Sequence, residues 1–150
     1  MLEITDPKEK QAVLNAKAKV KALSGNPRIV ATSPAVADIC DKLDLDLVGV
    51  PKSSVSKIPS RYKKVKKVGL AMSPDMEIVS SLNPDWILAP SSLETDLKPK
   101  FEELKNTEYA FLNLRSVQGM YRSVQELGEI FGKQQEAEED EPKSLQTFYK

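Results

Sequence analysis

The feature that most constrains the fold of this chain is a strand, a helix and a second strand that follow one another within residues 28–50. Residues 28–33 (Arg-Ile-Val-Ala-Thr-Ser) predict a buried strand. Ser33 can cap a helix over 34–43, because its hydroxyl accepts a bond from a first-turn amide. Residues 46–50 predict the second strand. Strands joined through a helix pair in parallel, so the sequence predicts a parallel sheet.

The remaining chain continues this alternation of strands and helices. Further strands are predicted at 85–90 and 108–113, whereas 51–67 has no apolar period and predicts a long excursion over one sheet edge. The other predicted helices run from Pro7 to just before Gly25, from 74 to 82, from Ser92 or Thr95 to 104, and from 117 to 131 after a cap at Ser116. The predicted fold class is α/β: an open, mainly parallel sheet of four or five strands flanked by helices on both faces, a Rossmann-like lobe.

Residues 68–79 read as a loop that turns abruptly into a helix. Ser73 is the predicted N-cap and Pro74 the first helical residue. Met72 then lies just before the cap, on a loop whose exit direction is fixed. Its thioether either fills a gap in the core or faces a ligand as a soft donor, and core filling is the commoner role.

Composition excludes several classes of function. The 150 residues carry 22 basic and 22 acidic side chains, so the chain lacks the basic excess of a nucleic-acid binder. It has no histidine, which excludes Ser-His-Asp and Cys-His catalysis and removes the commonest metal ligand. The single cysteine, Cys40, is expected to be a small buried hydrophobe. We expect neither a signal peptide nor a membrane span, since no apolar run approaches ~20 residues.

The other conspicuous charged and aromatic residues have ordinary structural interpretations. Asp44, Asp46 and the acidic run 136–141 predict solvated faces, and the basic run 63–67 predicts a solvated rim. Three further side chains are assigned to the rim or the core: Arg115 and Tyr62 to the rim, and Trp86 to the sheet core.

In an open parallel sheet a ligand binds beyond the carboxyl ends of the strands. The predicted loops that meet there are 32–34, 50–57 and 90–92. First-turn amides of the helices predicted to begin at Ser33 and Ser73 suit a carboxylate or a phosphate. The six glycines are scattered and none forms the glycine-rich turn of a nucleotide site, so nucleotide binding is disfavoured.

Four segments carry a family resemblance: 28–32 (Arg-Ile-Val-Ala-Thr), 46–50 (Asp-Leu-Val-Gly-Val), 68–79 (Val-Gly-Leu-Ala-Met-Ser-Pro-Asp-Met-Glu-Ile-Val) and 82–88 (Leu-Asn-Pro-Asp-Trp-Ile-Leu). Together they resemble the amino-terminal lobe of haem-receptor lipoproteins of Gram-positive ABC importers, which are class III substrate-binding proteins. The resemblance runs from about Arg28 to Glu139. The third segment is specific to haem receptors, and the Pro-Asp-x-Ile part of the fourth is shared with siderophore and cobalamin receptors.

The resemblance implies that haem is the ligand and that Met72 is an axial ligand of its iron. In this family the other axial ligand is a histidine of the second lobe. A lysine after the second strand pairs with a haem propionate, and Lys57 is its closer equivalent here, with Lys52 as the second choice. Backbone amides around Thr32 and Ser33 are implied to bind the other propionate.

One further pocket residue comes from the predicted sheet: Ser91 follows the third strand, in a loop at the carboxyl ends of the strands. The resemblance implies a docking residue and a domain organisation. Glu77 matches a glutamate by which such receptors dock onto arginines of the permease. The expected organisation is an N-terminal helix and lead-in (1–27), a haem-binding N-terminal lobe (28–133) and the start of a truncated inter-lobe connector (134–150).

The expected function is to form half of a haem cleft and to deliver haem to a permease for iron acquisition, without catalysis. Expected partners are haem, the ABC permease, the missing C-terminal lobe and, bridged by haem, a second copy of the chain. The expected location is the extracellular face of the cell membrane, lipid-anchored in the full-length protein, with the anchor absent from this chain. Two alternatives stay open: a siderophore or cobalamin receptor lobe of the same class, and a small flavodoxin-like domain that binds a phosphorylated ligand.

Overall fold

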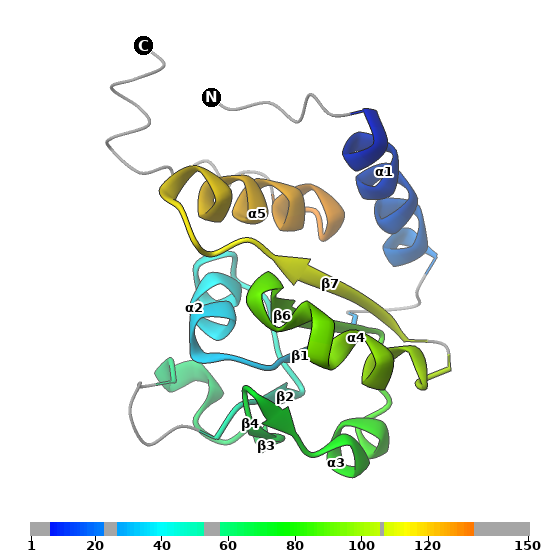
Figure 1. Cartoon of the computed structure of the whole chain (residues 1–150). Coiled ribbons are helices and arrows are strands. Elements are labelled where there is room, and N and C mark those ends of the chain that lie inside the picture. The colour runs from blue at the N-terminus through cyan, green and yellow to red at the C-terminus, as the bar shows by residue number, and fades with distance from the viewer. Residues whose placement is uncertain (1–6, 23–26, 53–57, 106, 134–150) are drawn as a thin grey trace.

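A parallel sheet runs through the middle of the molecule. The computed structural model describes residues 7–22, 27–52, 58–105 and 107–133 (Figure 1). Five strands form this sheet in the order β3-β2-β1-β6-β7, and every neighbouring pair is parallel. The strands are β1 (Ile29–Ala31), β2 (Gly49–Val50), β3 (Lys66–Lys67), β6 (Trp86–Pro90) and β7 (Glu108–Leu112). The predicted α/β fold class with a mainly parallel sheet is therefore confirmed.

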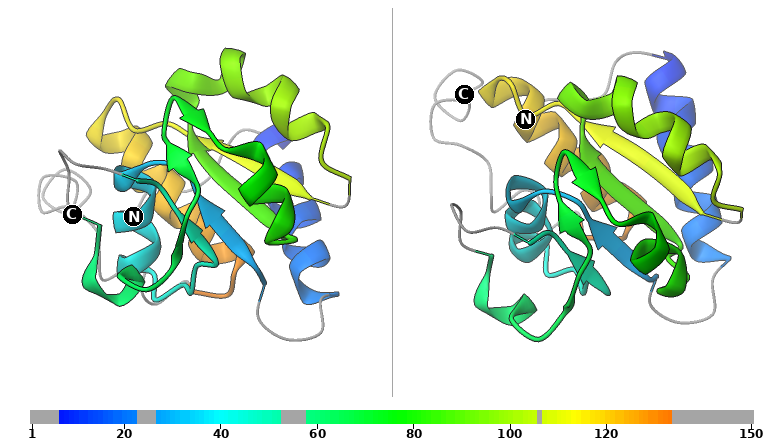
Figure 2. Two further views of the ribbon diagram at one scale, coloured as in Figure 1. Left: turned by 90° about the horizontal axis from the view of Figure 1, so that it is seen from below. Right: turned by 60° about the horizontal axis from the view of Figure 1, so that its bottom comes forward.

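Helices cover both faces of this sheet. They are α1 (Pro7–Lys21), α2 (Pro34–Lys42), α3 (Met76–Ser81), α4 (Glu94–Glu102) and α5 (Val117–Ile130), with short 3-10 turns η1 (Ser60–Tyr62) and η2 (Ser91–Leu93). Helices α1, α2 and α5 share one apolar core, and α3 and α4 share the other, on the opposite face (Figure 2). Among the described residues, no helix combines the length and the apolar character needed to cross a membrane.

Successive residues of the central strands supply the two cores in turn. In β1, Ile29 and Ala31 belong to the core under α2 and α5, whereas Val30 belongs to the core under α3 and α4. In β6, Leu88 and Ile87 divide in the same way. Side chains of a strand point alternately to its two faces, so a sheet covered on both faces requires uninterrupted apolar strands. This requirement explains why the sequence predicted these two strands.

Of the helix caps predicted at Ser33, Ser73 and Ser116, two are confirmed and one is wrong. The Ser33 Oγ accepts the backbone N–H of Val36 at 3.2 Å, and the Ser116 Oγ accepts that of Gly119 at 2.9 Å. Helix α4 follows the η2 turn and begins at Glu94, between the two predicted starting points Ser92 and Thr95. The wrong cap is Ser73.

The segment around Ser73 forms a hairpin instead of the start of a helix. Strands β4 (Gly69–Leu70) and β5 (Ser73–Pro74) pair antiparallel. The N-cap of α3 is Asp75, whose Oδ1 accepts the backbone N–H groups of Glu77 at 3.0 Å and Ile78 at 3.3 Å. Aspartate caps as well as serine does. Residues 73–74 are therefore free to pair with β4, and the helix begins later than predicted.

The excursion after β2 is more ordered than the sequence indicated, at least over residues 58–67, which carry η1 and β3. Tyr62 is buried, not at the rim, and its hydroxyl donates to the Leu45 carbonyl. Arg61 donates to Asp44 at 2.9 Å and to Asp46 at 3.1 Å. These contacts fasten the excursion to the turn before β2, an attachment that a count of apolar residues does not reveal.

The first turn of α5 departs from the predicted apolar face. Val117 and Met120 are exposed, whereas Tyr121, Val124 and Leu127 are buried as predicted. The first turn extends beyond the carboxyl end of β7, where no further element of the described chain covers it (Figure 1). Helical periodicity predicts which residues share a face, but not how far the covering sheet reaches.

Candidate functional site

The candidate site lies at the carboxyl end of the sheet, on the left-hand side of Figure 1. The β4–β5 hairpin lies at the same end, near the point where β1 leads into α2 (Figure 2). Backbone hydrogen bonds hold it there. Lys52 donates its N–H to the Gly69 carbonyl at 2.8 Å, and Val68 donates to the Val50 carbonyl at 2.9 Å. The structure therefore brings the Met72 segment against the loop after β2.

Met72 lies in the two-residue turn that joins β4 to β5. Its side chain is 74% exposed, and it belongs to neither apolar core of the described residues. The core-filling role is therefore wrong for Met72. Of the residues at this end of the hairpin, Pro74 in β5 is buried, whereas Met72 in the turn is exposed. An exposed thioether on a hairpin tip is positioned to meet a ligand.

Thr32 and Ser33 follow β1, at the point where the sheet meets α2. Thr32 donates both its backbone N–H (3.1 Å) and its hydroxyl (3.2 Å) to the Leu88 carbonyl, and it is buried. This differs from the prediction that a Thr32 amide binds a carboxylate, because β1 and β6 pair through this residue. The Ser33 hydroxyl accepts the Val36 N–H, and so Ser33 orients the first turn of α2 toward the same end of the sheet.

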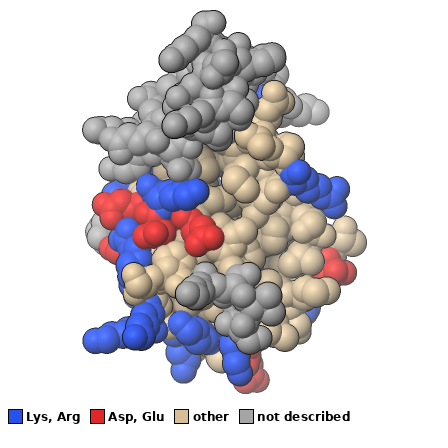
Figure 3. All heavy atoms as spheres, turned by 90° about the vertical axis from the view of Figure 1, so that its left-hand side faces the viewer, with Lys and Arg blue, Asp and Glu red and all other residues tan. Residues whose placement is uncertain are grey.

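The other predicted pocket residues are distributed around this end. Lys52 is exposed and adjoins the hairpin through its backbone bond to Gly69. Ser91 begins η2 after β6 and is half-buried. Lys57 lies outside the described residues. Figure 3 looks onto this end and shows uncharged side chains right of centre, an acidic cluster flanked by basic side chains on the left, and further Lys and Arg side chains at the upper right and along the lower margin.

Two neighbouring residues of α3 have opposite environments. Met76 packs against the core under α3 and α4, as predicted, and Glu77 is exposed. Both line a shallow groove of about 490 Å³ between α3 and the end of α4, together with Ser80, Lys100 and Leu104. Glu77 therefore lies on an outer face of the molecule, where another protein could contact it.

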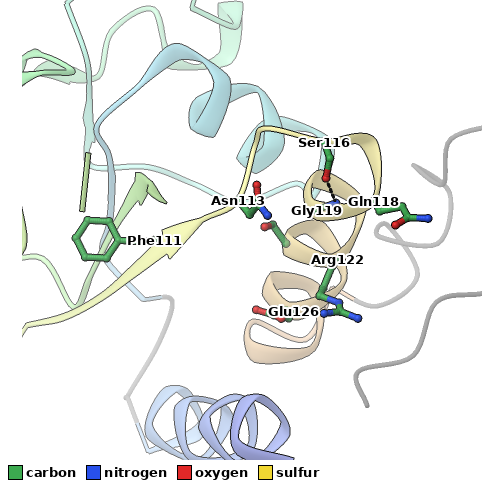
Figure 4. A pocket seen from close by; sticks show the side chains of 8 residues that line it. Phe111, Asn113, Ser116, Gln118, Gly119, Arg122 and Glu126 are labelled. Atoms are coloured by element: carbon green, nitrogen blue, oxygen red, sulfur yellow. Dashed lines mark hydrogen bonds between the residues drawn. The ribbon is translucent and has the colours of Figure 1, made fainter. Parts of the chain in front are cut away.

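A separate cavity of about 380 Å³ lies between the end of β7 and the first turns of α5 (Figure 4). Asn113, Ser116 and Gly119 lie together at the helix start, while Phe111 points away from α5. The Asn113 Oδ1 accepts the Arg115 N–H at 3.0 Å, so this side chain serves the local turn. None of the described residues predicted for the ligand site lines this cavity, which is therefore distinct from the candidate site.

The described residues offer neither a reactive thiol nor a group of side chains that could hold a metal ion directly. Cys40 is fully buried, as predicted, and burial raises the pKa of its thiol to about 12. The thiolate, which is the nucleophile and the metal ligand, is then scarce at neutral pH. Within the described ranges, no three Cys, Asp or Glu side chains are gathered as a metal ion would require.

Comparison with solved structures yields relatives of the same fold. An ABC transporter substrate-binding protein from Listeria monocytogenes EGD-e is 43% identical, with a TM-score of 0.76, over 82% of this chain and 46% of that one. Staphylococcus aureus IsdE complexed with heme is 36% identical, with a TM-score of 0.71, over 77% of this chain and 44% of that one. The siderophore-binding protein BauB shares the fold at 22% identity, with a TM-score of 0.62, over 78% of this chain and 44% of that one.

Comparison of sequences agrees with these structures. The chain is 37% identical over 116 residues to the high-affinity heme uptake system protein IsdE of Staphylococcus aureus, strain Newman. That alignment covers 77% of this chain and 39% of IsdE, so the chain spans well under half of its relative's length. A model of the periplasmic binding protein family matches residues 29–148. Because this match includes the sheet and all the helices that follow β1, the chain belongs to the periplasmic binding protein family.

Proposed function

We propose that this chain is one lobe of a haem-binding receptor that delivers haem to the permease of an ABC importer. The observation that carries the proposal is the position of Met72: a sulfur donor, 74% exposed, on a hairpin tip at the carboxyl end of a parallel sheet. The likeness to IsdE, which was solved with heme, supports haem as the ligand. The siderophore alternative has only the likeness of fold to support it.

In this proposal each residue has one task. The Met72 sulfur is an axial ligand of the haem iron, a role that thioethers fill in other haem proteins. A lysine pairs with a propionate, with Lys57 as the first candidate and Lys52 as the second, and the first turn of α2 after Ser33 receives the other propionate. Ser91 borders the same pocket. Haem is bound and released unchanged, so no catalytic group is needed.

The proposed organisation follows from this assignment. Residues 28–133 form the lobe, and 134–150 start a connector to a second lobe. The helix within 1–27 packs on α5, where Val13 and Ala16 join the core that α2 and α5 share. We therefore propose that α1 is part of the folded lobe. The receptor is proposed to act at the extracellular face of the membrane, held by a lipid anchor in the full-length protein.

The test is haemin binding by two methionine variants. Met72→Ala removes the proposed iron ligand, so the position and intensity of the Soret band of bound haem should change and affinity should fall at least tenfold, about 1.4 kcal/mol. Met76→Ala is the matched control, because Met76 lies four residues away and packs against the core. Its haem spectrum should equal that of the parent chain. Loss of the spectrum in Met76→Ala but not in Met72→Ala would contradict the proposal.

We further propose that Glu77 is the contact with arginines of the permease. It is exposed and lies in the first turn of α3. In the full-length receptor, Glu77→Lys should therefore leave haem binding intact while impairing haem uptake by cells, because like charges then face each other at docking. Glu103→Lys is the matched control on the other wall of the same groove. Normal uptake by Glu77→Lys, or lost haem binding, would count against this role.

A further inference from the structure

The hairpin that presents Met72 exposes a second large apolar side chain. Leu70 is 59% exposed, and it belongs to neither apolar core of the described residues. A single exposed leucine is ordinary on a protein surface. Here, however, the leucine lies two residues before the candidate iron ligand, on the same two-stranded element.

The pairing register of the hairpin determines which way Leu70 points. Gly69 pairs with Pro74, and Leu70 pairs with Ser73. Paired residues of an antiparallel ribbon have side chains on the same face, and successive pairs alternate between faces. Pro74 is buried, so the Gly69–Pro74 face is the inner one, and Leu70 and Ser73 share the outer face, where both are exposed.

The frame of the hairpin prevents Leu70 from turning inward. Gly69 has a φ of 101°, which a residue with a side chain adopts only with strain. Its carbonyl accepts the Lys52 N–H at 2.8 Å, and the Asp75 N–H bonds to the Val68 carbonyl at 2.6 Å. A shift of register by one residue would break these bonds and expose Pro74. The exposure of Leu70 is therefore imposed by the fold.

The charge distribution around the hairpin indicates what would cover Leu70. Uncharged side chains lie right of centre at this end, with basic side chains along the lower margin and at the upper right, and an acidic cluster on the left (Figure 3). Lys52, Lys66 and Lys67 are exposed on the strands and loop to which the hairpin is bonded. A planar ligand with an apolar body and an anionic edge complements such a surface.

From this arrangement we infer that Leu70 packs against the face of the porphyrin ring beside the iron. The hairpin then recognises the two parts of the ligand separately: Leu70 contacts the macrocycle and Met72 binds the metal. This inference rests on the proposed function and extends it. It assigns to Leu70 a contact with the porphyrin ring, which would contribute to affinity even when the porphyrin contains no iron. Leu70 is thereby a specificity-determining residue for porphyrins as a class.

The experiment compares haemin with metal-free protoporphyrin IX, using quenching of the single tryptophan, Trp86, to measure both affinities. Leu70→Ser should weaken both ligands by about tenfold, because an apolar contact of this size is lost whether or not iron is present. Leu70→Met, which restores an apolar side chain, should recover most of the loss. Met72→Ala should instead lower the ratio of haemin affinity to protoporphyrin affinity. Leu14→Ser is the matched control, because Leu14 is 44% exposed on α1.

The outcomes separate this inference from the proposed function. Equal weakening of both porphyrins by Leu70→Ser, with recovery in Leu70→Met and no effect of Leu14→Ser, supports the inference. Unchanged affinities in Leu70→Ser, while the parent chain binds both porphyrins, overturn the inference and leave the proposed function standing. Weakening of haemin alone also overturns it, because Leu70 then acts through the metal. If the parent chain binds neither porphyrin, the proposed function fails, and the inference fails with it.

Discussion

The only thiol of the chain, Cys40, lies on the face of α2 that packs into the apolar core. Its side chain is fully buried, whereas the next residue, Asp41, is exposed. Burial raises its pKa to about 12, with a smaller opposing effect from the charge of Arg61. The folded chain therefore holds the thiol proton more tightly than the unfolded chain does. The resulting contribution to stability is complete below the ordinary value of 9.0 and is lost as pH rises toward about 12.

Two measurements check this residue. Cys40 should resist a thiol reagent such as DTNB at neutral pH and react fully in denaturant, because only the thiolate attacks. Cys40→Ala should reduce the fall in unfolding free energy between pH 9.0 and about 12. Burial, and next to it the charge of an ionised Cys40, raise the pKa of Tyr62, so Tyr62→Phe should also reduce the fall at alkaline pH, and the effects of the two variants should not be additive. Rapid labelling of the folded chain would contradict the burial of Cys40.

At the scale of elements, two nearby residues at the boundary between β5 and α3, Asp75 and Ser73, should differ in how much they stabilise the fold. Asp75→Ala removes the acceptor of the Glu77 and Ile78 amides, and should lower the unfolding free energy by about 1 kcal/mol. Ser73→Ala, at the position that the sequence favoured as the cap, should change it by less than about 0.5 kcal/mol. Urea denaturation of both variants measures the difference. A larger loss of unfolding free energy in Ser73→Ala than in Asp75→Ala would indicate that Ser73 is the cap and that the helix begins at Pro74.

Local chemistry was sufficient to predict most elements of the fold, but not the hairpin. The apolar runs of β1 and β6 and the caps Ser33 and Ser116 depend on neighbours in sequence, and they were found. The β4–β5 hairpin depends on the bond from Lys52 to Gly69, which joins residues that the sequence alone does not bring together. Gly69 was the available signal, because a glycine before a short polar segment often marks a turn.

For the candidate site, the residues alone favoured a core position for Met72, since methionine is usually buried, and its 74% exposure shows that this was wrong. Its role as a ligand of the haem iron, which the resemblance implies, stays a proposal. Thr32 was expected to offer its amide, but strand pairing with Leu88 consumes it. Both errors have the same source. Tertiary contacts decide whether a polar or sulfur group is exposed at the surface or is used in packing and hydrogen bonding inside the protein.

At the scale of the whole molecule, the exposed hairpin bears on association. Under the proposed function this chain would contact one of the two faces of haem, and it contains no histidine that could serve as a second axial ligand. We propose that haem joins two copies, with Met72 supplied from each side of a two-fold axis. Sedimentation should show a dimer at one haem per two chains, and a monomer for Met72→Ala. Monomers of the parent chain at full haem loading would rule out the shared site.

The bonds that hold the hairpin join backbone groups alone: Lys52 to Gly69, and Asp75 to Val68. The side chains of the turn take no part in these two bonds. The chemistry of the tip can therefore change while its support stays the same, and under the proposed function such a change would alter the ligand preference without altering the fold. For protein engineering, the two-residue turn is therefore a natural place for substitution: Ala71 and Met72 can be replaced while the backbone bonds that support the hairpin are kept.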